Sequence, residues 1–354
     1  MPKNILIIGG AGFIGINSAR YFIKKGWSVS IFDDLSRPGS EFNIKNLSSE
    51  YGRRFYFKKG DITTDRKTLQ SLINKHNVVL HLAAQVAVTT SIISPEDDFR
   101  INVVGTFNIL EAIRKSRNKP FLIYSSTNKV YGALRQHSVV EKQTRYVFKD
   151  KKIRSRGISE NTQIDFHSPY GCSKGAADHY VIDYGRIYGL KTVVFRQSCI
   201  YGEHQMGVED QGWVAWFAIA ALLQKKITVF GTGKQVRDLL YVGDLVRLYD
   251  IAIKKIDKVS GQAFNIGGGP QNTLSLIECF NVLSKKLNLS INTKRSKART
   301  GDQPIFISDN SKALRLLNWR PTVSVSAGLD QMLSWIMNNR KVIEKTRTLK
   351  KINS

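Results

Sequence analysis

The feature that most constrains the fold is a glycine-rich turn near the start of the chain, between an apolar run and an amphipathic segment. Residues 4–10 (NILIIGG) predict a buried parallel strand, and residues 16–26 (INSARYFIKKG) predict a helix. The glycines of the turn, in a G-x-G-x-x-G arrangement with one preceding glycine, are Gly9, Gly10, Gly12 and Gly15. Such glycines permit a tight turn and let the backbone approach a pyrophosphate at the helix N-terminus. The sequence therefore predicts a dinucleotide site at this turn.

Strands and helices are predicted to alternate over roughly the first 200 residues. Apolar runs typical of buried strands stand at 28–34, 54–62, 78–84, 120–126 and 191–197, and helical patterns stand at 102–116 and 175–190. This alternation predicts an α/β fold, a Rossmann-type doubly wound parallel sheet with a smaller C-terminal lobe.

The expected domain organisation follows from where the alternation loosens. We expect residues 1–200 to form the dinucleotide-binding domain, with segment 237–265 returning to it, and residues 201–354 to form mainly a substrate-binding lobe. Residues 133–168 are polar and weakly periodic, which leaves three interpretations: a lid, an oligomer contact or a long surface loop.

The net charge of +26 raises the question of whether the protein binds nucleic acid or anionic small molecules. Lysines and arginines are scattered along the whole chain, and the densest runs, at 149–157 and 340–354, are not interleaved with aromatic residues as in a nucleic-acid groove. We therefore predict a solvated basic surface that attracts anionic small molecules, and no nucleic-acid partner.

Composition also bears on compartment and metal binding. Three cysteines without paired spacing (Cys172, Cys199 and Cys279) predict reduced thiols and a cytoplasmic protein. Six histidines without ligand spacing argue against a metal site. The N-terminus lacks the pattern of a signal peptide, and the apolar run 213–223 is too short for a bilayer, so we predict a buried helix and no membrane association.

An acidic pair, Asp33 and Asp34, ends the second predicted strand. A carboxylate there can bind the adenosine ribose hydroxyls and repel a 2′-phosphate, which favours NAD over NADP. Arg37 nearby leaves the alternative cofactor open.

Tyr170 and Lys174 are four residues apart in a predicted helix, so their side chains share one face. A lysine ammonium beside a phenol is expected to lower its pKa and to make it a base near neutral pH. Tyr21 and Lys25 have the same spacing, but their place in the first helix gives them a structural role.

Motifs spread over nearly the whole chain resemble the extended short-chain dehydrogenase/reductase superfamily, which includes NAD-dependent epimerases and dehydratases. They are GGAGFIG, GDI (60–62), HLAA (81–84), NVVGT (102–106), SSTNKVYG (125–132), YGCSK (170–174), RQSCIYG (196–202) and VRDLLYVGDL (236–245). The resemblance implies that Tyr170 is the catalytic acid/base. It also implies that Lys174 holds the nicotinamide ribose and that Thr127 is the third catalytic residue.

The resemblance further implies NAD as the cofactor. The residues it assigns to NAD, besides Tyr170 and Lys174, are Gly9, Gly12, Phe13, Ile14, Gly15, Asp33, Asp34, Ser36, Arg37, Asp61, Ile62, Leu82, Ala83, Ala84, Asn102, Ser125 and Ser198. The residues it assigns to the substrate are Gln85, Thr127, Asn128, Lys129, Arg237 and Arg299.

The residues after Thr127 narrow the implied reaction. Nucleotide-sugar 4,6-dehydratases of the superfamily typically have Asp-Glu there, whereas this chain has Asn128 and Lys129, which favours epimerisation or simple oxidation. Arg237 and Arg299 stand where relatives hold a diphosphate, a role that suits a guanidinium, although each could instead form an ion pair.

Segments 85–92, 125–132, 167–180, 210–213 and 233–238 are most similar to 2-epimerases of CDP-linked dideoxyhexoses. Such enzymes act through a transient 2-keto sugar and retain NAD through the cycle. Alternatives are a C4 epimerase, a decarboxylase or a reductase of related sugars, and a non-catalytic NAD-binding regulator. Relatives commonly pair through helices flanking the tyrosine element, so a homo-oligomer is also expected.

Overall fold

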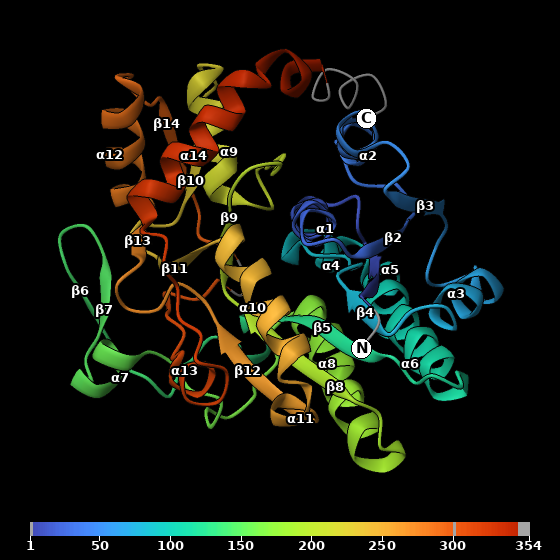
Figure 1. Ribbon diagram of the computed structural model, residues 1–354. Coiled ribbons are helices and arrows are strands. Elements are labelled where there is room, and N and C mark those ends of the chain that lie inside the picture. The colour runs from blue at the N-terminus through green and yellow to red at the C-terminus, as the bar shows by residue number, and fades with distance from the viewer. Residues whose placement is uncertain (1–2, 300–301, 346–354) are drawn as a thin grey trace.

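A seven-stranded parallel sheet forms the centre of the larger lobe in the computed structural model, which describes residues 3–299 and 302–345 (Figure 1). Its strands, in spatial order, are β12 (Gln262–Ile266), β8 (Thr192–Gln197), β5 (Phe121–Thr127), β4 (Val78–His81), β1 (Asn4–Ile8), β2 (Ser28–Asp33) and β3 (Phe55–Lys59). Each neighbouring pair is parallel. The predicted doubly wound sheet is therefore confirmed.

Helices cover both faces of this sheet, which explains why its strands are apolar runs rather than alternating ones. One face packs against α1 (Phe13–Lys24), α2 (Ser40–Tyr51), α10 (Val242–Lys254), α11 (Ile256–Val259) and α13 (Ser311–Leu317). The other face packs against α3 (Arg66–Ile73), α6 (Gly105–Lys115) and α8 (Pro169–Tyr188). Residues Ile5 to Ile8 are fully buried between the layers, and each such side chain stabilises the fold by roughly 1.5–3 kcal/mol relative to exposure.

The strand order reverses between β1 and β4, and ligands of open α/β sheets bind at the carboxyl ends of strands at this place. The backbone is tightly packed there. A Cβ on Gly9, whose φ is +81°, would lie 2.5 Å from the amide nitrogen of Ala83, so only glycine fits. The turn after β1 is thereby held against the segment that follows β4.

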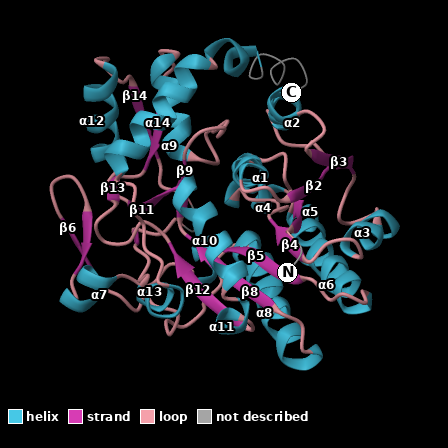
Figure 2. Cartoon of the chain, in the orientation of Figure 1, coloured by secondary structure: helices cyan, strands magenta, loops and turns pink. Residues whose placement is uncertain are grey.

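A smaller lobe is built from short strands and three longer helices (Figure 2). One sheet contains β9 (Cys199–Tyr201), β11 (Val236–Tyr241), β13 (Thr273–Ser275) and β15 (Ile305–Phe306), and β10 (Ile227–Phe230) pairs with β14 (Thr293–Ser296). The helices are α9 (Trp213–Leu222), α12 (Leu276–Leu287) and α14 (Val325–Asn338). From segment 237–265, β12 and α10 lie with the large sheet, whereas β11 lies in the small one.

Residues 133–168 fold against this smaller lobe. They contain the hairpin β6 (Val139–Glu141) and β7 (Tyr146–Phe148) and the short helix α7 (Lys151–Arg156). Arg145 forms an ion pair with Glu278 of α12, and the Tyr146 amide donates to the Lys234 carbonyl at 2.9 Å. The segment is therefore not a structureless surface loop, since it carries its own hairpin and helix and packs on the C-terminal lobe, whereas its roles as a lid or an oligomer contact stay predictions.

Most predicted elements are confirmed, and the differences lie at their ends. Strand β4 stops at His81, and the predicted helix 102–116 is divided into the π-helical turn η1 (Arg100–Val104) and α6. The remaining elements are α4 (Val88–Ile93), α5 (Pro95–Phe99) and the 3-10 turn η2 (Asn128–Tyr131). Among the residues described, no helix has both the length and the apolar character that crossing a bilayer requires.

Candidate active site

Helix α8 brings Tyr170 and Lys174 together on one buried face. Ser168 caps the helix by accepting a hydrogen bond from the Gly171 amide at 3.1 Å, and Pro169 occupies the first turn. Ser168 has a φ of +120°, a region that favours glycine, so the backbone is strained immediately before the catalytic tyrosine. Tyr170 is 8% exposed and Lys174 is 3% exposed.

The Lys174 ammonium is held by the neighbouring strand β5. Its Nζ donates to the Ser125 carbonyl at 2.7 Å and lies 4.3 Å from the centre of the Tyr124 ring. Burial lowers the pKa of Lys174 to about 7, against the opposing effects of Asp178 and Asp98. This lysine therefore changes its charge near neutral pH.

The net shift of the Tyr170 pKa in this structure is upward, and the lowering effect expected from Lys174 is not among its causes. Burial raises the pKa of Tyr170 to about 12, while a hydrogen bond with Thr127 and the nearby Arg37 guanidinium act in the lowering direction. The reason is geometric, because the ammonium is directed to Ser125 and Tyr124. The hydroxyl that assists the phenol in this arrangement is Thr127.

A cavity of about 320 Å³ is lined by residues of both the larger and the smaller lobe. Most of the residues predicted to bind the substrate are among them. The predicted residues that line it are Thr127, Asn128, Lys129, Tyr170, Ser198, Arg237 and Arg299. Gln85 is not among the lining residues. Its amide donates to Asp98 at 2.9 Å and to the Ala87 carbonyl at 2.8 Å, so its hydrogen-bonding capacity is directed into the protein.

Both arginines of this cavity form ion pairs. Arg237 pairs with Asp302 at 2.6 Å, and Arg299 pairs with Asp210 at 3.0 Å. The Arg299 guanidinium also lies over the ring of Phe230, 3.9 Å from its centre. The ion-pair alternative is thus observed, and both cations still face the cavity where an anion could replace the carboxylates.

Sequence reasoning missed the aromatic wall of the cavity. Trp213, Trp216 and Phe217 come from the first turns of α9, and Phe230 comes from the end of β10. The apolar composition of the run 213–223 predicts a buried helix but does not show that one face of the helix lines a cavity. The i, i+3, i+4 spacing of the three aromatic residues was the signal that they share one face.

Lys129 occupies the cavity beside Thr127. Its Nζ donates to Oε1 of Gln303 at 3.1 Å, and Gln303, which sequence reasoning also missed, is fully buried. Burial and the neighbouring Arg237 lower the pKa of Lys129 to about 8. Where dehydratase relatives are expected to have a carboxylate, this site therefore has an amine.

The turn after β1 fits a dinucleotide. A Cβ on Gly15 would lie 2.4 Å from the Gly9 carbonyl oxygen, so this glycine keeps helix and turn in contact. A Cβ on Gly12 would meet only the Gly9 oxygen, at 3.4 Å, so the space before the start of α1 is open. The Asp33 carboxylate accepts hydrogen bonds from the amides of Ala11 and Leu35 at 3.0 and 2.8 Å. Burial raises the pKa of Asp33, and these two bonds act against that rise.

The other residues predicted to bind NAD follow the carboxyl ends of neighbouring strands. Phe13 and Ile14 begin α1 after β1; Asp34, Ser36 and Arg37 follow β2; Asp61 and Ile62 follow β3; Leu82, Ala83 and Ala84 follow β4; Ser125 lies in β5; and Ser198 follows β8. Asn102 in η1 lies at this edge as well, because its side chain accepts a hydrogen bond from the backbone amide of Gln85 at 3.0 Å. The sheet thus brings the predicted set to one edge, although their contacts with NAD stay predictions.

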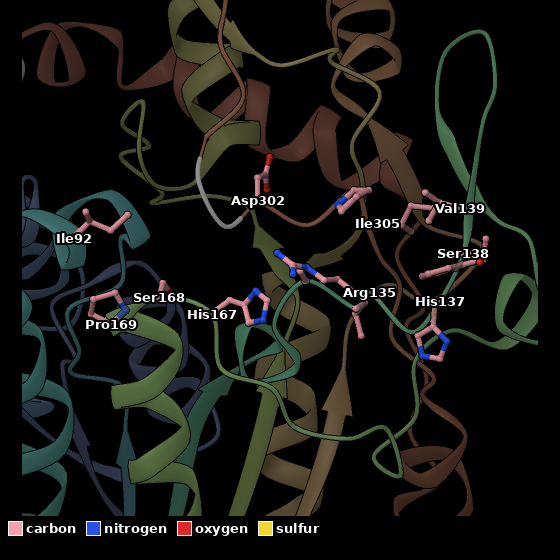
Figure 3. A pocket seen from close by; sticks show the side chains of 14 residues that line it. Ile92, Arg135, His137, Ser138, Val139, His167, Ser168, Pro169, Asp302 and Ile305 are labelled. Carbon is pink, nitrogen blue, oxygen red and sulfur yellow. The ribbon is translucent and has the colours of Figure 1, made fainter.

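A second cavity, of about 770 Å³, lies between segment 133–139 and the start of α8. Figure 3 shows His167, Ser168 and Pro169 on one side of it and Arg135 near its middle. Asp302, the partner of Arg237, lines both cavities. The two spaces therefore adjoin at this carboxylate.

Comparison with known proteins agrees with this site. Residues 5–267 match the NAD dependent epimerase/dehydratase family. The chain is 46% identical over 338 residues to CDP-paratose 2-epimerase of Salmonella typhi, with 94% of this chain and 98% of that protein covered. It is 31% identical to a putative UDP-glucose 4-epimerase of Methanocaldococcus jannaschii over 95% of this chain and 99% of the relative.

Among solved structures, UDP-glucuronic acid 4-epimerase of Bacillus cereus in complex with UDP-glucuronic acid and NAD superimposes with a TM-score of 0.79 at 29% identity. The match covers 95% of this chain and 99% of that chain. Together with the glycine turn and the Thr127, Tyr170 and Lys174 set, these matches show that the chain is an NAD-dependent epimerase and belongs to the NAD dependent epimerase/dehydratase family.

Proposed function

We propose that this enzyme inverts C2 of a CDP-linked dideoxyhexose, converting CDP-paratose into CDP-tyvelose through a transient 2-keto sugar. The observation that carries the proposal is the 46% identity over almost the full length to CDP-paratose 2-epimerase. The cavity that joins Tyr170 and Thr127 to two arginines supports a sugar linked to a diphosphate.

Tyr170 takes the proton from the sugar hydroxyl, and Thr127 supports the sugar oxygen as charge develops. Because burial raises the pKa of Tyr170, its ionisation depends on the Thr127 hydrogen bond and the Arg37 guanidinium, which act in the lowering direction. NAD, when bound, would supply the acceptor for the hydride of the sugar carbon and the donor that returns it to the opposite face. Lys174 would hold the nicotinamide ribose in place. After the keto sugar has turned, Tyr170 returns the proton to the oxygen, so the reaction has no net redox change.

The acids of the cavity support epimerisation over dehydration. An elimination needs a proton donor and a base near the C5 and C6 atoms of the sugar, in addition to Tyr170. Asn128 and Lys129 follow Thr127. Of the acids that line the cavity, Asp210 and Asp302 are paired with arginines, and Glu209 is exposed in the segment before α9.

The nucleotide is proposed to lie toward the smaller lobe. Arg237 and Arg299 would bind the diphosphate, because a guanidinium matches the geometry of phosphate oxygens. Trp213, Phe217 and Phe230 provide flat apolar surfaces on the same side for a pyrimidine ring.

A homo-oligomer in the cytoplasm completes the proposal. Phe107 on α6 and Tyr180 and Tyr188 on α8 are large aromatic side chains at 40–47% exposure on neighbouring helices, and burying them would favour self-association. The cytoplasmic assignment is supported by Cys172, Cys199 and Cys279, which are free thiols. The absence of a nucleic-acid partner stays a prediction.

The test is NMR of the purified protein with CDP-paratose in deuterated water, without added NAD. We expect CDP-tyvelose to form with the C2 hydrogen retained, because that hydrogen is carried by tightly held NAD and does not exchange with solvent. Exchange of that hydrogen would contradict the mechanism. No conversion, with or without added NAD, would contradict the substrate assignment, and conversion of UDP-glucose to UDP-galactose would instead favour a C4 epimerase.

A further inference from the structure

The fully buried carboxylate of Asp98, in α5, joins two segments that surround the catalytic pair. Its Oδ1 accepts hydrogen bonds from Nε2 of Gln85 at 2.9 Å and from Nδ2 of Asn102 at 3.2 Å. Its Oδ2 accepts a hydrogen bond from the Ser173 hydroxyl. Asp98 therefore connects the loop after β4 with helix α8, and Asn102 adds a second connection, because its Nδ2 also donates to the Ser173 hydroxyl at 3.0 Å.

Each partner of Asp98 is adjacent to a group of the active site. Ser173 directly precedes Lys174 and lies one turn after Tyr170 on α8. Gln85 directly follows Ala84, and its backbone exchanges two hydrogen bonds with the Asn102 side chain, at 3.0 and 3.1 Å. A displacement of Asp98 would consequently move both the catalytic helix and the loop proposed to contact NAD.

The charge of Asp98 also acts on the catalytic pair. A carboxylate buried among neutral donors is costly unless a cation lies near. The nearby cation is Lys174, whose pKa Asp98 and Asp178 raise against the effect of burial. Asp98 likewise raises the pKa of Tyr170.

We propose that Asp98 is a positioning residue of this active site, which fixes Ser173 and Gln85 relative to each other and places a buried negative charge beside Tyr170 and Lys174. Asp98 does not line the substrate cavity, so it acts through its neighbours. The inference rests on the proposed function only in that Tyr170 and Lys174 do the chemistry. It does not depend on which sugar is bound.

The titratable groups around the pair come from several elements. They are Asp98 of α5, Asp178 of α8, His81 of β4, Tyr124 of β5 and Arg37 after β2. Burial and Lys174 hold the pKa of His81 well below its usual range, so this imidazole is neutral. Asp178 forms a buried ion pair with Arg196 at 2.9 Å, which leaves Asp98 as the buried acid near Lys174 without an arginine partner among the residues described.

The experiment compares the pH dependence of kcat in the holoenzyme for Asp98→Asn and the native protein. Asparagine preserves the size of the side chain but removes the charge and one acceptor. We expect kcat to fall about tenfold to a hundredfold. Both limbs of the pH profile, which report the ionisations of Lys174 and Tyr170, should move to lower pH by about one unit. The NAD content should remain unchanged.

Two further variants separate the two parts of the proposal. Ser173→Ala keeps the charge and removes the bridge, so kcat should fall without a shift of the limbs. Asp97→Asn removes a charge from the same short helix, but this carboxylate is exposed and pairs with Arg100 at 2.8 Å, so its profile should match that of the native enzyme. Unchanged limbs in Asp98→Asn would overturn the proposal. Full activity in Ser173→Ala would overturn it even if Asp98→Asn does not fold.

Failure of the proposed function is distinguishable from failure of this inference. If the native enzyme does not convert CDP-paratose, the substrate assignment fails. The ionisation of Tyr170 can then be followed by tyrosinate absorbance, as the part of the signal lost in Tyr170→Phe. The Asp98→Asn change should move that ionisation to lower pH, and an unmoved ionisation would overturn the role of Asp98.

Discussion

Asp302 accepts a hydrogen bond from Arg237 at 2.6 Å, at the place where the substrate cavity adjoins its larger neighbour. A diphosphate that binds Arg237 must compete with this carboxylate. Asp302 therefore acts as a counter-ion that lowers the apparent affinity for a charged substrate and keeps the guanidinium oriented before the substrate arrives.

Asp302→Asn should lower the KM for the nucleotide sugar about two- to fivefold, because a partly exposed ion pair of about 0.5–1 kcal/mol no longer competes with the substrate. Steady-state kinetics at two salt concentrations would measure this effect. Asp330→Asn is the matched control, since Asp330 also pairs with a cationic side chain, Lys286 at 2.6 Å, but lies outside the cavity. An increased KM in Asp302→Asn would show that the carboxylate contacts the substrate directly.

Tyr170→Phe should abolish turnover, by about a thousandfold or more, while NAD remains bound, because the ring still packs but cannot transfer a proton. Product formation by NMR and the NAD content of the purified protein would test both parts. Tyr21→Phe is the control that the chain itself offers. Tyr21 has the same spacing to a lysine, with Lys25 5.5 Å from its ring centre, yet it lies in α1 and should leave turnover unchanged. Substantial activity in Tyr170→Phe would falsify its assignment as the acid/base.

The rate should fall as the pH rises through the pKa of Lys174. The burial of its ammonium lowers this pKa from the ordinary lysine value to about 7, so the cation that is proposed to hold the ribose is present below neutral pH and is lost above it. The dependence of kcat/KM on pH between about 5.5 and 9.5 would reveal this limb. A profile that stays flat to pH 9 would show that Lys174 keeps its proton in the working enzyme.

Two glycine substitutions should have different effects. Gly12→Ala places a methyl group in open space before α1, so the protein should fold with a similar Tm but bind NAD at least tenfold more weakly. Gly15→Ala places its methyl group 2.4 Å from the Gly9 oxygen, so Tm should fall by several degrees. Thermal unfolding with and without NAD would separate the two, and equal losses of Tm would contradict this distinction.

The fold was predictable where short-range patterns carry the information. The apolar runs and the glycine turn predicted the parallel sheet, and the Tyr170–Lys174 spacing predicted that the two side chains share one helix face, because strand burial and helix periodicity are local properties. The residues that the family resemblance assigns to the substrate line one cavity, with the exception of Gln85.

The parts that sequence could not give depend on contacts between distant segments. Asp98 meets Ser173 seventy-five positions later, and Arg145 meets Glu278 across the lobe, so neither contact leaves a local pattern. The direction of the Tyr170 pKa shift depends on how deeply the phenol is buried and on where the lysine points. The prediction that Gln85 binds the substrate overlooked a distant contact in the same way, because the side-chain amide of Gln85 donates a hydrogen bond to Asp98.

Strand β12 (Gln262–Ile266) is an edge of the large sheet, although it comes more than sixty residues after β8 in the chain. During synthesis, β8 is therefore an open edge until the first part of the smaller lobe, with β9, α9, β10 and β11, has left the ribosome. An unpaired parallel edge is prone to pair with other chains. Fragments that end near residue 200 should consequently aggregate, and the order in which the chain emerges delays completion of the large sheet until part of the smaller lobe has been made.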